Sequence, residues 1–306
     1  MRFFYPNTRL IIIGLALLLT FLPLGSQLTF ILAGILVGTI GLMHGATDHI
    51  LYLNTRGQRA GATLPVRFFI EYLGVLMVFG FVWYLVPWLA FGIFILISAY
   101  HFGQTQLQYL PLSEKSWQKK ATYALWGLGV LGMIVLLNPA ESEKLINSML
   151  QSPAVDDFFS NQATLLGFAM AGLCLLAILF NAKGSSIKKL GFEIAEVLVI
   201  MCFSYYANLV LSFALFFGLW HSLRASQVQI DKLTEDQPFS AKDFVKNSLA
   251  FTLISLVGIA GLIVAADQLS SQIVPEMLFL VAISLLTMPH MVIYERFYNR
   301  HDRATL

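Results

Sequence analysis

Residues 28–50 read LTFILAGILVGTIGLMHGATDHI, an apolar run in which Asp48 is the first charged residue. A stretch of about 20 apolar residues is long enough to cross the hydrocarbon core of a bilayer as one helix. The same run contains His44 and His49. Because ionisable side chains are costly inside a membrane, they are commonly kept there for function. The run therefore predicts a membrane-spanning helix that carries functional residues.

The composition extends this interpretation to the whole chain. Of its 306 residues, 58% are hydrophobic and 12% are charged, and the mean hydropathy is +0.74. Soluble proteins carry about 25% charged residues, so this chain needs lipid as its solvent. The net charge of +2 and the lack of Lys/Arg runs exclude a nucleic-acid-binding surface. Cys174 and Cys202 lie in apolar runs, so no disulfide framework is expected.

A scan with a window of about 20 residues finds ten apolar segments. The first is expected to be retained, because no small-residue cleavage site follows it. We therefore expect one all-α domain over residues 1–306, a polytopic integral membrane helix bundle of about ten transmembrane helices. The long polar stretch 229–245 is expected to form a cytoplasmic loop. The apolar segments are 9–25, 28–50, 66–86, 88–110, 120–138, 162–181, 190–207, 208–228, 246–267 and 275–297.

The basic residues predict the orientation of the chain. If the N-terminus is cytoplasmic, every one of the 19 Lys and Arg residues except Lys144 falls on the cytoplasmic side, as the positive-inside rule expects. Lys144 lies in a segment that also holds Glu141, Glu143, Asp156 and Asp157. An even number of spans with both termini in the cytoplasm is therefore predicted.

Histidines in the apolar segments are the candidate functional residues. Counted from the expected outer ends of four helices, His44, His101, His221 and His290 all lie roughly 20 to 24 Å deep. Imidazole nitrogens bind iron, copper or zinc, so four of them at one depth predict a shared buried metal site. The alternative is that each forms an isolated hydrogen bond between helices. His301 lies in the polar tail and is expected to be solvated.

Several neighbouring residues are weaker candidates. His49 follows His44 by five positions and points away by roughly a hundred degrees or more on an ideal helix, so it is expected beside the site or at the membrane interface. Asp48 and Glu196 could orient ligand imidazoles, whereas Glu193 is expected at an interface near a helix N-terminus. Side chains that could line a pocket, or simply pack, are Tyr100, Gln104, Trp220 and Tyr294.

Four motifs resemble the Brp/Blh-like β-carotene 15,15′-dioxygenases, in the same order and over nearly the whole chain. They are His-Gly-Ala-Thr-Asp-His at 44–49, Tyr-His-Phe-Gly-Gln at 100–104, Trp-His-Ser-Leu-Arg at 220–224 and Pro-His at 289–290. The resemblance implies a multi-pass enzyme of the cell inner membrane that uses Fe(2+) and O2. Its reaction would cut the central double bond of β-carotene, or of a related carotenoid, into two molecules of retinal, often for a microbial rhodopsin.

The resemblance also implies roles for particular residues. By motif position, His44, His101, His221 and His290 would be the iron ligands and the catalytic residues. Members of the family often carry a further histidine one helical turn after the Trp-His pair, where this chain has Ala225. His290 would then complete the ligand set.

The same residues also fit functions of other classes. A haem-binding electron carrier could use the four histidines as two axial pairs. A non-enzymatic transporter or proton relay would likewise place His, Asp and Glu inside membrane spans. A membrane di-iron desaturase or hydroxylase would need more histidines, including His-x-x-His pairs, which this sequence lacks.

Overall fold

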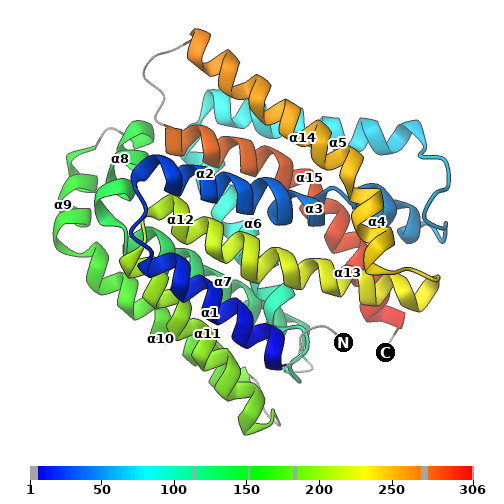
Figure 1. Cartoon of the computed structure of the whole chain (residues 1–306), viewed down its shortest axis with the longest axis horizontal. Coiled ribbons are helices and arrows are strands. Elements are labelled where there is room, and N and C mark those ends of the chain that lie inside the picture. The colour runs from blue at the N-terminus through cyan, green and yellow to red at the C-terminus, as the bar shows by residue number, and fades with distance from the viewer. Residues whose placement is uncertain (1–5, 113–114, 151, 182–184, 270–274, 305–306) are drawn as a thin grey trace. The chain divides into compact units, whose positions relative to one another are not determined.

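The computed structural model describes residues 6–112, 115–150, 152–181, 185–269 and 275–304. Within these ranges the regular structure is helical and no strand occurs, which confirms the all-α prediction. The chain divides into two compact units, whose helices are labelled in Figure 1. Unit 1 combines Val37–Phe91 with Ala225–Leu306, and unit 2 combines Arg2–Leu36 with Gly92–Arg224. The prediction of a single domain stays a prediction.

Unit 2 is a set of packed helices with α7 and α11 at its centre. Helix α7 packs against α10 and α11, α11 packs against α1, and α12 packs against α2. Helix α6 begins at the end of unit 1 and continues through unit 2. The elements are α1 (Pro6–Phe21), α2 (Ser26–Leu36), α6 (Pro87–Leu107), α7 (Ser116–Leu136), α8 (Pro139–Leu150), α9 (Pro153–Asn161), α10 (Ala163–Asn181), α11 (Ile187–Tyr206), α12 (Leu209–Ala214) and the π-helix η2 (Leu215–Ser222).

Glycines bring the backbones of α6 and α7 into contact. A Cβ atom built on Gly103 would overlap the backbone of Tyr123, and one built on Gly127 would overlap the backbone of Ala99. Only glycine fits at these two positions, and small residues are the usual means by which membrane helices approach closely. The contact fixes α6, which carries His101, against α7.

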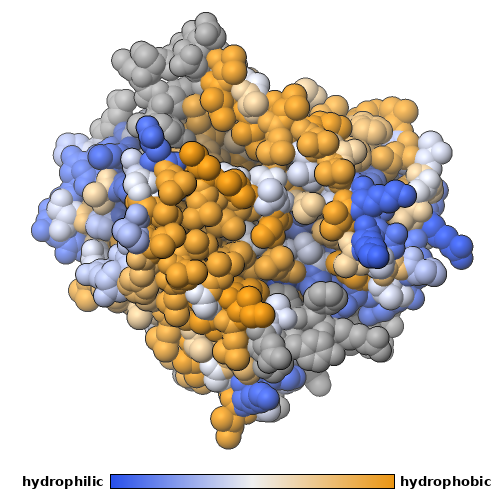
Figure 2. Space-filling model, viewed as in Figure 1, coloured by the Kyte–Doolittle hydropathy of each residue, from blue (hydrophilic) through white to orange (hydrophobic). Residues whose placement is uncertain are grey.

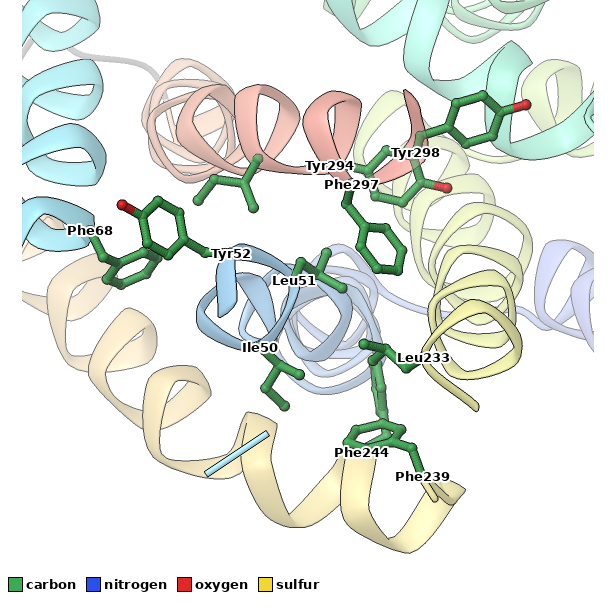
Figure 3. Packing of buried hydrophobic residues seen from close by; sticks show 11 residues of the cluster. Ile50, Leu51, Tyr52, Phe68, Leu233, Phe239, Phe244, Tyr294, Phe297 and Tyr298 are labelled. Atoms are coloured by element: carbon green, nitrogen blue, oxygen red, sulfur yellow. The ribbon is translucent and has the colours of Figure 1, made fainter. Parts of the chain in front are cut away.

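Unit 1 holds the N-terminal histidine motif and the last two helices. Helix α15 packs against α4 and α5, and α14 packs against α3. A buried cluster joins α4, α5, α13, α14 and α15, with Leu51 facing Phe297 and Ile50 directed away from it, toward α14 (Figure 3). The elements are η1 (Val37–Gly41, a π-helix), α3 (Leu42–Gly45), α4 (Asp48–Thr55), α5 (Val66–Leu85), α13 (Leu223–Asp236), α14 (Ala241–Leu269) and α15 (Pro275–Ala304).

Seven helices in the described part of the chain are long and apolar enough to span a membrane, or eight if the bent pair Pro153–Asn161 and Ala163–Leu179 forms one span. The predicted ten spans are therefore not confirmed. The apolar part of α1 is shorter than a full span, and α11 includes Lys188, Lys189, Glu193 and Glu196. The side of the membrane on which the termini lie stays a prediction.

Apolar side chains also cover large areas of the surface, as the orange regions of Figure 2 show. On α14, Leu253, Ile254 and Val257 are 53%, 64% and 73% exposed. On α5, Ile70 and Val78 are each 67% exposed. Exposed apolar faces of this kind would be costly in water, so lipid is the solvent that suits them.

The predicted cytoplasmic loop at 229–245 is wrong. Helix α13 continues to Asp236 and α14 begins at Ala241, so only residues 237–240 separate two helices. The polar composition of this stretch reflects one face of an amphipathic helix, because Leu233 is fully buried. Ser240 and Asp243 cap the start of α14 through reciprocal side-chain hydrogen bonds to each other's backbone N–H.

Candidate metal centre

His44 and His290 lie side by side in unit 1. Their rings meet edge to face with centroids 4.9 Å apart, and the residues are only 4% and 2% exposed. His44 belongs to the short helix α3, and His290 follows Pro289 inside α15. Two motifs nearly 250 residues apart in the sequence are therefore brought together, as the metal-site prediction requires.

Both rings are oriented through Nδ1. Nδ1 of His44 lies 2.5 Å from the carbonyl oxygen of Gly41, and Nδ1 of His290 lies 2.6 Å from Oδ1 of Asp48. Because both partners are acceptors, a neutral ring donates from Nδ1 and carries its lone pair on Nε2. Histidines that bind metals are commonly oriented in this way by a carbonyl or a carboxylate. Asp48 was expected to orient a ligand imidazole, and the structure gives His290 as its partner.

Helix α13 supports the first motif from the side. The Gln229 amide donates to the backbone carbonyl of His44 at 3.1 Å. The Thr47 hydroxyl lies 2.8 Å from Oε1 of Gln229 and 2.8 Å from the same carbonyl. Sequence reasoning missed Thr47 and Gln229. A glutamine on the buried face of an amphipathic helix is the signal that could have found the second of them.

His101 and His221 form a second pair, in unit 2. Their ring centroids are 4.9 Å apart, and each residue is 3% exposed. Aromatic rings enclose His221, with the centroid of Phe102 at 4.4 Å and the ring of Phe217 stacked at 5.6 Å. Sequence reasoning missed both phenylalanines, although Phe102 adjoins His101 and Phe217 precedes His221 by one turn.

A π-helical turn accompanies one histidine of each pair. The π-helix η1 ends at Gly41, three residues before His44, and η2 contains His221. The Ser222 hydroxyl donates to the carbonyl of Phe217 at 2.6 Å, five residues earlier, which is the spacing of a π-helix. Turns of this kind occur frequently at functional sites, because an additional residue redirects the side chains that follow it.

The weaker candidates in unit 1 have distinct surroundings. The ring centroid of Tyr294 is 5.7 Å from that of His290, which places Tyr294 beside a predicted ligand. His49 is half-buried and stacks on Phe251 of α14, with ring centroids 4.6 Å apart. Its Nδ1 lies 3.2 Å from the carbonyl of Ala46. His49 therefore packs against α14, whereas His44 packs against His290.

In unit 2, the weaker candidates mostly pack against other aromatic or polar residues. The Gln104 amide donates to the Tyr100 hydroxyl at 3.4 Å, and the Trp220 ring lies 5.7 Å from that of Phe203. Glu196 is buried in a cluster of ion pairs together with Glu193. Glu193 is 0% exposed and paired with arginine, and its expected position at a membrane interface stays a prediction.

These observations describe two buried histidine pairs, one in each unit. In His44 and His290, Nδ1 forms the hydrogen bond, so the unprotonated Nε2 is the nitrogen that can bind a metal. Neutral imidazole suits iron, copper or zinc, so the donor chemistry fits the predicted metal. The prediction that all four histidines share one ion stays a prediction.

Comparisons with known proteins bear on the chemistry of these residues. A family model described as "Beta-carotene 15,15'-dioxygenase" matches residues 35–298, a range that contains all four histidines. A protein of that name from the uncultured marine bacterium 66A03 is 24% identical over 270 residues, which cover 87% of this chain and 93% of the relative. No solved structure matches the chain.

Proposed function

Because the chain belongs to the β-carotene 15,15′-dioxygenase family, we propose that it cleaves a carotenoid with O2 and releases retinal. The family match over residues 35–298 is the observation that carries this proposal. In the balanced reaction the carbon–carbon double bond breaks and each of its carbons receives one oxygen atom of O2. No other reductant or oxidant is therefore needed. We propose β-carotene, or a related carotenoid, as the substrate, and its central double bond as the position of cleavage.

We propose Fe(2+) as the cofactor and His44, His101, His221 and His290 as its ligands. The buried positions of the four imidazoles and the Nδ1 hydrogen bonds of His44 and His290 support this assignment. When bound, iron would supply the activation of O2. The chain's own contribution is orientation and the exclusion of water. The carbonyl of Gly41 and the carboxylate of Asp48 orient two rings, and Phe102 and Phe217 enclose a third.

We propose the cell inner membrane as the location, with the enzyme crossing it several times. The apolar helices support a lipid environment. A carotenoid is itself apolar and dissolves in the bilayer, so it can reach a buried site without passing through water. Retinal leaves through the bilayer as well, and a microbial rhodopsin is the proposed user of this product.

Expression in cells that accumulate β-carotene tests the proposal. We expect the orange pigment to bleach and retinal to appear in the extract. Each of the substitutions His44→Ala, His101→Ala, His221→Ala and His290→Ala should abolish bleaching, whereas His301→Ala should leave it unchanged. Well-folded protein in cells that stay orange would contradict the proposed activity.

Analysis of the purified protein separates the proposal from its rivals. We expect bound iron and an absorbance spectrum without the Soret band of a haem. A Soret band would favour the haem-binding electron carrier. Protein that binds no metal at all would favour a transporter or proton relay.

A further inference from the structure

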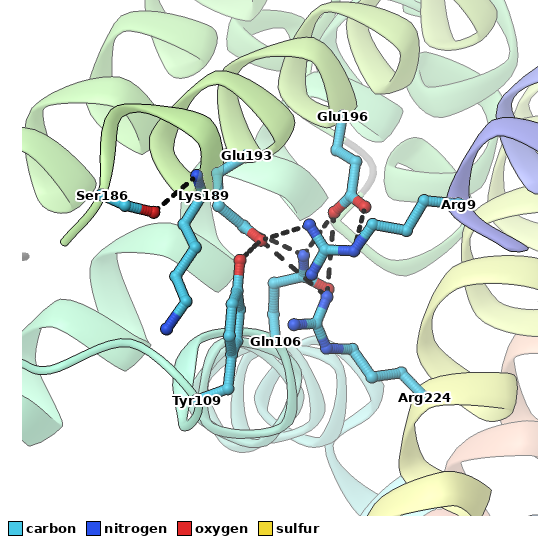
Figure 4. Close-up of polar contacts among 8 residues, drawn as sticks. All are labelled: Arg9, Gln106, Tyr109, Ser186, Lys189, Glu193, Glu196 and Arg224. Carbon is cyan, nitrogen blue, oxygen red and sulfur yellow. Dashed lines mark hydrogen bonds and ion pairs between the residues drawn. The ribbon is translucent and has the colours of Figure 1, made fainter. Parts of the chain in front are cut away.

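A cluster of buried charges lies in unit 2, formed by residues from three parts of the chain (Figure 4). It contains Arg9 of α1, Glu193 and Glu196 of α11, and Arg224 at the start of α13. The two glutamates are 0% and 2% exposed, and both arginines are 6% exposed. The formal charges of the four side chains cancel.

Short polar contacts connect these side chains. Nη1 of Arg9 lies 3.3 Å from Oε1 of Glu193, and its Nε lies 3.5 Å from Oε1 of Glu196. Nη1 of Arg224 lies 3.9 Å from Glu193 and 3.8 Å from Glu196. The amide of Gln106 lies within hydrogen-bond distance of both carboxylates, at 3.0 and 2.6 Å. Each glutamate is therefore held by three helices at once.

The ring of Tyr109 completes the cluster. Its hydroxyl donates to Oε1 of Glu193 at 2.5 Å. The guanidinium carbon of Arg9 lies 5.1 Å from the ring centroid, and that of Arg224 lies 4.6 Å from it. Contacts of this kind between cations and an aromatic face are attractive and depend on the direction of approach. The two arginine side chains are therefore held both by ion pairs and by contact with the face of the Tyr109 ring.

Two members of the cluster lie close in sequence to predicted iron ligands. Gln106 follows His101 by five residues on α6, and Arg224 follows His221 by three residues. Replacing a whole buried ion pair by uncharged residues is often neutral for stability, whereas removal of one partner is costly. Such pairs can instead specify one arrangement of helices among several.

We propose that the Arg9–Glu193–Glu196–Arg224 cluster is a positioning device for His101 and His221. Through Gln106, which contacts both glutamates, it fixes the rotation of α6 against α11, and through Arg224 it fixes that of η2. The two imidazoles are thereby held in one orientation. This inference rests on the proposed function, because it treats both histidines as iron ligands. It also gives a role to α1, which precedes the first residue of the family match.

Balanced double variants test the positioning role, because single substitutions leave a buried charge without compensation. In Arg224→Met/Glu196→Gln, Arg9 and Glu193 remain as a neutral pair. In Arg9→Met/Glu193→Gln, Arg224 and Glu196 remain. We expect both double variants to melt close to the parent protein in detergent. Their iron affinity, measured by competition with a chelator, should fall by about ten-fold or more, as for other residues that orient metal ligands.

Two single variants refine the comparison. Arg224→Lys keeps the charge but loses the planar guanidinium, and it should bind iron with an affinity between those of the parent and the double variant. Arg67→Met is the matched control, because Arg67 makes an ion pair with Glu71 within one helix and its side chain is 72% exposed. It should bind iron as tightly as the parent.

Each outcome decides between the alternatives. Double variants that fold and bind iron as tightly as the parent would overturn the positioning role. Double variants that unfold would show that the cluster serves stability, and would also overturn it. A parent protein that binds no iron would refute the metal assignment itself, which separates failure of the proposed function from failure of this inference.

Discussion

Asp48 connects the first histidine motif to the last helix through one hydrogen bond. Its carboxylate lies 2.6 Å from Nδ1 of His290, and Asp48 is itself 2% exposed. A buried carboxylate that accepts from Nδ1 holds the imidazole in the tautomer whose Nε2 can bind a metal. Asp48, four residues after His44, therefore affects a predicted ligand in another part of the chain.

Replacement of Asp48 by alanine should weaken iron binding. We expect Asp48→Ala to lower the iron affinity by roughly 10- to 100-fold, because the His290 ring loses its orienting acceptor. Carotenoid cleavage should fall with it. Chelator competition on the purified protein measures the affinity. Asp157→Ala, which removes an exposed carboxylate, should have no effect, and an unchanged affinity in Asp48→Ala would contradict the assigned role.

The two histidines of the first motif should respond differently to the same substitution. His49→Phe keeps an aromatic ring against Phe251, so we expect iron content and cleavage close to those of the parent. His44→Phe removes a predicted ligand and should abolish both. Iron per chain and retinal formation measure the difference. Loss of iron in His49→Phe would make His49 a ligand as well.

Among the helices, α6 and α7 approach closely at Gly103 and Gly127. Gly127→Ala should destabilise the protein by about 1–3 kcal/mol, because the added methyl group overlaps the backbone of Ala99. It should also disturb His101, which lies half a turn along α6 from Ala99. Thermal unfolding in detergent gives the stability. Gly172→Ala is the control, since its Cβ meets no atom within 4 Å. Equal melting temperatures would show that the two helices can separate without cost.

Most helices could be predicted because apolar runs and helix-ending residues give their positions. The segment expected at 66–86 is α5, Val66–Leu85. The segments expected to begin at residues 88 and 208 correspond to α6, which begins at Pro87, and to α12, which Asn208 caps. The prediction of a loop at 229–245 was wrong because a hydropathy average includes both faces of an amphipathic helix. The π-helices η1 and η2 could not be predicted, since a single additional residue barely changes the apolar period.

The site was predictable only in part, for a physical reason. Depth in the membrane follows from sequence position, so the histidines could be selected as a group. Hydrogen-bond partners depend on how each helix is rotated about its axis, and the position of a residue in the sequence does not give that rotation. The pairing of Asp48 with His290 and of Arg9 with Glu193 joins residues 242 and 184 positions apart. Neither could be anticipated from one chain without knowledge of which helices are neighbours.

For the molecule as a whole, the distribution of charge and the apolar surface support the same environment. In the predicted topology the basic residues are concentrated on one side of the membrane, and in the structure the apolar side chains of α5 and α14 face outward. The segment at 139–161, predicted to lie on the non-cytoplasmic side of the membrane, forms helices α8 and α9 with acidic residues on them. The predicted topology requires that this segment and residues 237–240 lie on opposite sides of the membrane.

Cysteine labelling measures this topology. In a background with Cys174 and Cys202 replaced by alanine, the exposed residues Lys144 and Lys242 would be changed singly to cysteine. A membrane-impermeant maleimide added to intact spheroplasts should label Lys144→Cys and leave Lys242→Cys unlabelled until the cells are lysed. The reason is that basic segments are retained in the cytoplasm during insertion. The reverse pattern would place both termini outside, and labelling of both positions from one side would require a different number of spans between them.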